Sequence, residues 1–149
     1  MASGWYNSGL RDVSDGTIDL VNDTIKVMLV TGSYTPDKDH DFVNDVSANE
    51  LSGTGYTGGF AGSGRKTLSG KAFTTNTTSD FVKWAFSAVT WSAINAGTAR
   101  YAIIIKEITN DAASRLVGYL DLGGSGVVTN GGDLTITPDA TDGALKITA

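Results

Sequence analysis

The chain has 149 residues, of which 19 are Gly, 2 are Pro and none is Cys, and its formal net charge is −5. This length is that of one domain, and a hydrophobic content of 40% beside 18% charged residues excludes disorder for most of the chain. The negative charge gives no general attraction to nucleic acid or anionic lipid, and the lack of Cys excludes disulfides and thiolate metal sites.

The first 16 residues are expected to form a short helical arm on a single domain that spans residues 1–149. Over residues 3–14, Trp5, Tyr6, Leu10 and Val13 recur close to the 3.6-residue period of a helix. Gly9 lowers the helix propensity, so only about one to three turns are expected. No basic and apolar leader is seen at the start, and we therefore expect a protein that is made and folded in a cytoplasm.

Residues 24–30 give the first clear strand. After Lys26 this run is continuously apolar, which indicates a central strand that is buried on both faces. Residues 32–49 form a long polar connection, which Phe42 and Val46 are expected to hold against the core. Between residues 53 and 70 the chain is rich in Gly, which favours bulged or irregular edge chain.

Further short strands are predicted at residues 71–75, 81–86, 88–91, 99–107 and 116–122. Residues 133–137 and 144–148 are expected to pair as a hairpin around a turn at residues 138–143. Turn signals at intervals of roughly 8–12 residues are typical of a sandwich or barrel, so the sequence predicts an all-β sandwich. Its core is expected to include Ile25, Val27, Leu29, Trp84, Phe86, Ile103, Ile105, Leu120 and Ile136.

Two glycine-rich segments match the residue pattern of phosphate-binding motifs but lack the structural context that these motifs need. Residues 53–58 match G-x-G-x-x-G, and residues 59–67 nearly match a phosphate-binding loop in which Arg65 displaces Lys66 by one position. Both motifs need a helix directly after the glycines, because the N-terminus of that helix binds the phosphate. The residues that follow here do not start a helix, so nucleotide binding is not expected.

The acidic loop at residues 37–41 is the one tempting metal site. Its alternating Asp residues could wrap a calcium ion, but the helix–loop–helix context and the closing Glu of such sites are missing. His40 is the only histidine, so a two-histidine metal site is excluded and a Ser–His–Asp triad would have to use it. We expect a solvated loop, no cofactor, no metal and no enzymatic activity, with calcium binding at this loop left open.

Sugar binding is a separate alternative. Aromatic side chains on strands could stack on sugar rings, as in carbohydrate-binding jelly rolls, although aromatics at this density more often belong to a core. The candidates are Phe81, Trp84, Phe86, Trp91 and Tyr101.

Several runs spread over the chain form a recognisable series. The first are residues 6–10 (YNSGL), 16–20 (GTIDL) and 23–30 (DTIKVMLV), followed by 33–36 (SYTP), 41–42 (DF) and 53–56 (GTGY). The last are residues 99–104 (ARYAII), 116–121 (LVGYLD) and 131–136 (GGDLTI). Together they resemble a family of small head structural proteins of tailed bacteriophages, and the likeness covers almost the whole chain.

The resemblance implies a capsid cement or decoration protein with a jelly-roll-like β-sandwich. Such a protein is made in the host cytoplasm, lies on the capsid exterior of the virion, and bridges neighbouring subunits of the major capsid protein. The alternatives are a tail, neck or head-fibre component of the same virion, and a carbohydrate-binding β-sandwich module. Neither a nucleic acid nor a membrane is expected as a partner.

Four residues are the candidate partner contacts. Trp5 and Tyr6 are large aromatic side chains near a terminus, where they either fold back onto the core or bury in a neighbour. Arg65 and Lys66 are the only adjacent pair of basic residues and would form a basic tip that meets an acidic capsid surface. Open strand edges with few Lys or Pro guards further indicate self-association as a homodimer or homotrimer.

Overall fold

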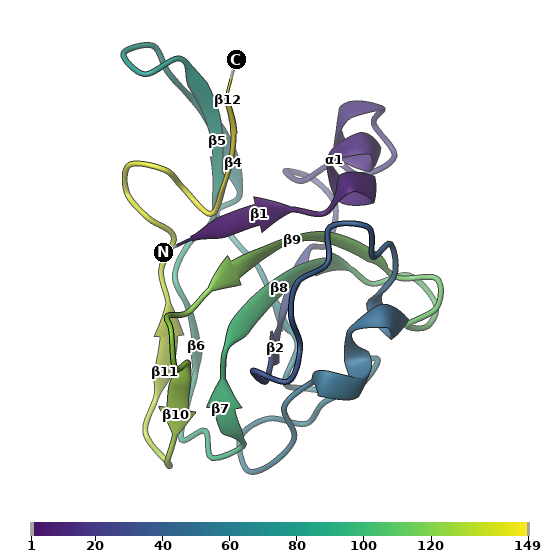
Figure 1. Cartoon of the computed structure of the whole chain (residues 1–149), viewed down its shortest axis with the longest axis vertical. Helices are drawn as coiled ribbons and strands as arrows, with labels where there is room; N and C mark the ends of the chain where they lie inside the picture. The colour runs from purple at the N-terminus through teal and green to yellow at the C-terminus, as the bar shows by residue number, and fades with distance from the viewer. Residues whose placement is uncertain (1, 149) are drawn as a thin grey trace.

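A computed structural model describes residues 2–148, which form a β-rich fold with one α-helix near the N-terminus (Figure 1). The helix α1 spans Asn7–Ser14, and the 3-10 helices η1 (Val43–Asp45) and η2 (Ser47–Asn49) lie in the long loop after β2. The strands within this part of the chain are β1 (Ser3–Trp5), β2 (Lys26–Val30), β3 (Lys66–Thr67), β4 (Ala72–Asn76), β5 (Phe81–Ala85), β6 (Val89–Trp91), β7 (Gly97–Ala99), β8 (Tyr101–Lys106), β9 (Arg115–Asp121), β10 (Val127–Thr129), β11 (Leu134–Ile136) and β12 (Leu145–Thr148).

The strands between residues 2 and 148 pair antiparallel in four sheets. The largest sheet has the order β1-β9-β8-β2-β3, and a three-stranded sheet has the order β12-β5-β4. Two small sheets pair β10 with β7 and β11 with β6. The β-rich class with a short N-terminal helix is thereby confirmed.

The centre of the five-stranded sheet is buried on both faces. Val27 and Leu29 of β2 point into the larger hydrophobic cluster, whereas Met28 and Val30 point into a second cluster on the other face. This alternation follows from the period of two along a strand, which sends neighbouring side chains to opposite faces. The continuous apolar run after Lys26 is therefore explained, and the expected burial on both faces is confirmed.

The larger cluster lies between the five-stranded sheet and the smaller sheets. Trp84 of β5 and Trp91 of β6 are fully buried in it, and each indole finds a backbone acceptor, Leu20 O at 3.3 Å and Gly64 O at 2.6 Å respectively. All nine predicted core residues are buried. Seven of them belong to this cluster, and Ile103 and Ile105 belong to the second.

The N-terminal arm differs from the sequence prediction. Trp5 and Tyr6 precede the helix, because residues 3–5 form β1 and pair with β9. Two glycines allow this close packing: a Cβ on Gly4 would lie 2.6 Å from the Tyr119 ring, and one on Gly9 would lie 2.4 Å from the Val117 carbonyl oxygen. The arm is thus integrated into the large sheet, and the helix is shorter than the predicted 3–14.

The expected hairpin of residues 133–137 with residues 144–148 is wrong. The chain does turn there, since Gly143 N donates to Asp139 O at 2.8 Å, but β11 pairs with β6 and β12 pairs with β5. These pairings place Leu134, Ile136 and Leu145 in the larger cluster. Tertiary burial therefore overrides the local turn signal.

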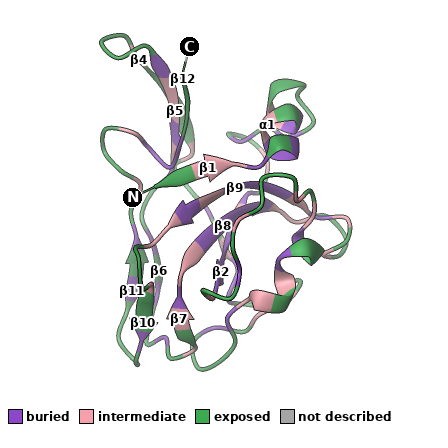
Figure 2. Cartoon of the chain, viewed as in Figure 1, coloured by how far each residue is buried: buried purple, intermediate pink, exposed green. Residues whose placement is uncertain are grey.

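The sheet β12-β5-β4 projects from the body of the fold at one end of the long axis (Figure 1). β5 and β12 reach the core through Trp84 and Leu145, while β4 is exposed along most of its length (Figure 2). The strands β10 and β11 lie toward the opposite end of the molecule. The fold therefore presents two separate ends that consist of short strands.

Candidate functional site

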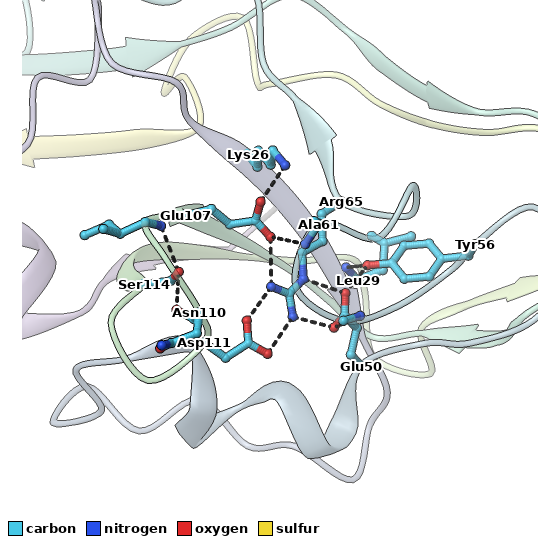
Figure 3. Close-up of polar contacts among 12 residues, drawn as sticks. Lys26, Leu29, Glu50, Tyr56, Ala61, Arg65, Glu107, Asn110, Asp111 and Ser114 are labelled. Atoms are coloured by element: carbon cyan, nitrogen blue, oxygen red, sulfur yellow. Dashed lines mark hydrogen bonds and ion pairs between the residues drawn. The ribbon is translucent and has the colours of Figure 1, made fainter.

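Arg65 is the centre of the densest group of charged side chains in the structure (Figure 3). Its guanidinium donates to Glu50 from Nε and Nη2 at 2.9 and 2.7 Å, to Asp111 from Nη1 and Nη2 at 2.6 and 3.1 Å, and to Glu107 from Nη1 at 3.0 Å. Glu107 also accepts from Lys26 Nζ at 2.5 Å. We call Lys26, Glu50, Arg65, Glu107 and Asp111 the Arg65 cluster.

The cluster joins segments that are far apart in the sequence. Lys26 begins β2, Glu50 follows η2, and Arg65 stands directly before β3. Glu107 follows β8, and Asp111 lies in the loop between β8 and β9. The cluster thereby fastens two irregular loops to the edge of the five-stranded sheet.

The electrostatics of the cluster are those of a closed interior site. Two cations face three carboxylates, and the Arg65 side chain has 0% exposed area. Burial acts to lower the pKa of Arg65, but the hydrogen bonds to Glu50 and Asp111 outweigh it and raise that pKa. Burial likewise acts to raise the pKa of Glu107, but the contacts with Lys26 and Arg65 bring it below its ordinary value. Arg65 and Glu107 therefore both stay charged at neutral pH.

Tyr56 extends the cluster into the glycine-rich segment. Its hydroxyl donates to Glu50 Oε1 at 3.0 Å and accepts from the Leu29 N–H at 2.9 Å, and Glu50 Oε2 accepts from Gly59 N at 2.9 Å. Burial raises the pKa of Tyr56 far above its ordinary value. Each buried side-chain polar atom among the described residues has a partner and the guanidinium is sealed from solvent, so this arrangement holds the loop in place.

Arg65 and Lys66 do not form the expected basic tip. Arg65 is in the interior, and Lys66 is half-buried in β3, where it pairs with Val27. No sequence pattern indicates this burial, because the three carboxylates around Arg65 come from positions 50, 107 and 111, which are far apart in the chain. The expectation of an exposed contact at Arg65 is therefore wrong.

Tyr6 folds back onto the core, and Trp5 does so in part. Tyr6 is 0% exposed, and its hydroxyl lies 2.9 Å from the Tyr34 hydroxyl, which in turn lies 3.1 Å from His40 Nδ1. Burial raises the pKa of Tyr6 far above its ordinary value. Trp5 is half-buried and donates from Nε1 to Lys146 O at 2.9 Å. Tyr6 is accordingly not available as an anchor for a neighbour.

In the acidic loop at residues 37–41, two of the three carboxylates accept hydrogen bonds from the same chain. Asp37 Oδ1 accepts from Asp39 N at 3.0 Å, and Asp39 Oδ1 accepts from the Asn7 amide at 2.7 Å. Across residues 2–148, no group of three or more His, Asp or Glu side chains is arranged to hold a metal ion. In the glycine-rich segment, residues 53–56 form a tight turn, and no helix follows it within the described chain.

The aromatic residues that could stack on sugars are in the core. Trp84, Trp91, Phe81 and Phe86 are buried, and Tyr101 is half-buried with the Arg100 guanidinium 4.4 Å above its ring centroid. These five residues therefore do not form an exposed stacking surface. None of the helices described is long and apolar enough to span a bilayer.

Within residues 2–148, seven large apolar side chains are exposed, and four of them belong to strands at the two ends of the fold that Figure 1 shows. The other three are Val21, Phe60 and Ile108. On the projecting sheet, Phe73 and Ile147 are 38% and 37% exposed. On β10, Val127 and Val128 are 37% and 68% exposed. These residues are not recognisable in the sequence, because an exposed Val or Phe in a short strand has the same local pattern as a core residue.

Comparison of the chain with protein-family models, curated proteins and solved structures gives no match.

Proposed function

We propose that this chain is a capsid cement or decoration protein of a tailed phage, which binds the major capsid protein on the outside of the head. The runs of sequence that resemble small phage head proteins support this proposal, and a two-layer sandwich of jelly-roll type is the fold that we propose with it. The arrangement of the larger core cluster between the five-stranded sheet and the smaller sheets supports such layering.

The observation that carries the proposal is the separation of a rigid interior from two adhesive ends. The charged residues that form a dense cluster are sealed inside, where they hold long loops in place. Within residues 2–148, four of the seven exposed large apolar side chains lie on short strands at opposite ends of the long axis. A cement protein needs this design, because it works by contact with neighbouring subunits and undergoes no chemistry.

We assign the capsid contact to the β10 end. Val128 is the most exposed large apolar side chain among the described residues, and it stands beside Val127 on a strand that pairs only with β7. Burial of adjacent apolar side chains in a partner favours association, and loss of one buried anchor typically costs about 2 kcal/mol, or roughly thirtyfold in affinity.

The test is the occupancy of expanded heads by Val128→Lys, with Val21→Lys as a matched control. Val21 is also exposed, at 42%, but it lies in the loop before β2 and away from the β10 end. We expect Val128→Lys to lower the affinity for heads by roughly thirtyfold and Val21→Lys to bind as the parent chain does.

Two results would contradict the proposal. If the parent chain does not bind heads and electron microscopy of the virion places it in the tail or neck, the cement function is wrong. If the parent chain binds heads and both variants bind equally well, the cement function holds but the contact is not at β10.

A further inference from the structure

The outer edge of β4 has no partner among residues 2–148. β4 is the last strand in the order β12-β5-β4, and four of its five residues are exposed. No backbone hydrogen bond or bridge joins this edge to another described segment. An open edge of this kind presents unpaired N–H and C=O groups, which form a ready template for another strand.

The β4 edge also lacks the features that commonly prevent such pairing. Residues 72–79 contain no charged residue, no Pro and no Gly. The register between β4 and β5 is regular over its five pairs, so no bulge twists the edge away. Lys71 precedes the strand, and its ammonium group donates to the Asp23 carbonyl oxygen and is held away from the edge.

We propose that β4 pairs antiparallel with β4 of a second copy of this chain, so that two projecting sheets join into one sheet across a two-fold axis. A chain with a net charge of −5 is repelled by its own copies, and contact is least opposed where the surface is uncharged. β4 offers five uncharged edge residues, whereas β10 offers three. This inference does not depend on the capsid function.

The geometry of antiparallel pairing fixes the register. A two-fold axis perpendicular to the sheet keeps the same residues on the same face in both copies. Directly opposed residues share a face, so the residue numbers of each pair must differ by an even number. An axis at Thr74 aligns all five residues of β4. Thr74 then lies opposite Thr74 of the second copy, and Phe73 lies opposite Thr75 of the second copy.

This register continues the apolar face of one projecting sheet into the second copy. Phe73 and Thr75 share a face with Val82 and Ile147, because Phe73 pairs with Trp84 while Thr75 pairs with Val82, which pairs with Ile147. Phe73, 38% exposed in one chain, meets the second copy's Thr75 on that face. Aromatic and β-branched side chains that are paired across strands stabilise a sheet.

The test uses opposite charges at Thr74. Lys83 of β5 is the direct partner of Thr74 within the chain, and its ammonium group donates to Ala140 O. Thr74→Glu therefore creates no like-charge pair within the chain, and we expect it to keep the fold. In the paired form, however, two Glu side chains face each other across the axis. Thr74→Lys has the same effect between copies, and an equal mixture of the two variants restores an opposite-charge pair.

Sedimentation velocity over about 1 μM to about 1 mM measures the mass, because a five-residue edge makes a small and transient interface. The parent chain should approach twice the 15.5 kDa chain mass, each variant alone should require at least about tenfold more protein, and the mixture should return to the parent behaviour. Thr148→Glu, on the opposite edge strand β12, is the matched control and should associate as the parent does.

Three outcomes overturn the proposal. The first is a parent chain that sediments as a monomer at about 1 mM. The β4 edge would then be unpaired or would pair with a strand of another protein. The second is association that Thr74→Glu does not weaken, which places the contact elsewhere. The third is a mixture of the two variants that stays as weak as each variant alone while both retain the parent circular dichroism spectrum.

Discussion

At the scale of single residues, Arg65 joins more carboxylates than any other basic side chain described, since it contacts Glu50, Glu107 and Asp111. It supplies the hydrogen-bond donors for Glu50 and Asp111 and shares Glu107 with Lys26. Without it, three carboxylates would remain close together at the base of two loops. Removal of one partner from a buried ionic group is costly because the charges left behind are desolvated and unpaired.

We therefore expect Arg65→Met to lower the free energy of unfolding by about 3–5 kcal/mol. Arg11→Met is the matched control, because the Arg11 side chain is 61% exposed and its partner Asp12 keeps the contact with Arg115. That control should change stability by less than about 1 kcal/mol. Urea unfolding followed by Trp fluorescence measures both, and equal losses in the two variants would contradict the role of the Arg65 cluster.

Glu107 should make stability depend on acid pH. Its pKa lies below the ordinary value of 4.5, so the folded protein holds this carboxylate charged more strongly than the unfolded chain does. The stabilisation is complete above about pH 4.5 and is lost as the pH falls through the lower folded value. Glu107→Gln should be less stable at neutral pH and should lose less stability on acidification, and parallel pH profiles for the two proteins would disprove this.

At the scale of secondary-structure elements, α1 shows how packing decides a boundary that propensity leaves open. The helix is short and contains Gly9, which is unfavourable in a helix. Its place is fixed by tertiary contact, because Gly9 lies directly against the backbone of β9 at Val117. The side chain that a helix former would add has no room there.

Gly9→Ala should destabilise the protein even though Ala favours a helix by about 1 kcal/mol over Gly. The added Cβ would lie 2.4 Å from a backbone oxygen of β9, so the helix or the strand must shift. Gly124→Ala is the control, because no atom lies within 4 Å of the added Cβ there. Thermal unfolding should show a lower Tm for Gly9→Ala alone, and a higher Tm would show that α1 is not held tightly to β9.

Elements with a strong apolar pattern were predictable, and elements that depend on distant partners were not. The apolar runs that form β2, β8 and β9 are enough by themselves to predict buried strands. Trp5 fits the helical period that predicts a helix over residues 3–14, but residues 3–5 form β1 because they pair with β9. The partners of β11 and β12 are strands 40 or more positions earlier in the chain, and no local signal points to them.

At the scale of the whole molecule, most of the carboxylates accept hydrogen bonds or pair with cations within the chain. Asp45 illustrates this in the long loop, where one oxygen accepts from the N–H groups of Asp41 and Phe42 at 3.1 and 3.0 Å. The Arg65 cluster was beyond prediction for the related reason that its members meet only after folding. Its only sequence signal is the adjacent basic pair Arg65 and Lys66, which predicts an exposed tip.

Removal of divalent metal should therefore leave stability unchanged. Treatment with a chelator, or addition of calcium at about 1 mM, should move the Tm by less than about 1 °C, because bound ligand stabilises only in proportion to its occupancy. Differential scanning calorimetry with and without each addition measures this. A calcium-dependent rise of several degrees that Asp39→Asn abolishes would establish a site in the acidic loop.

The pairing of Ser3 with Leu120 has a consequence for how the protein is made. During synthesis, β1 can pair only after β9 has left the ribosome. β5 can pair with β12 only after the end of the described chain has been made. Proteins dominated by such distant pairings fold slowly, typically over milliseconds to seconds. Most of the chain is therefore synthesised before its sheets can close, and the nascent protein passes through a stage in which one edge of β5 and one edge of β8 are unpaired.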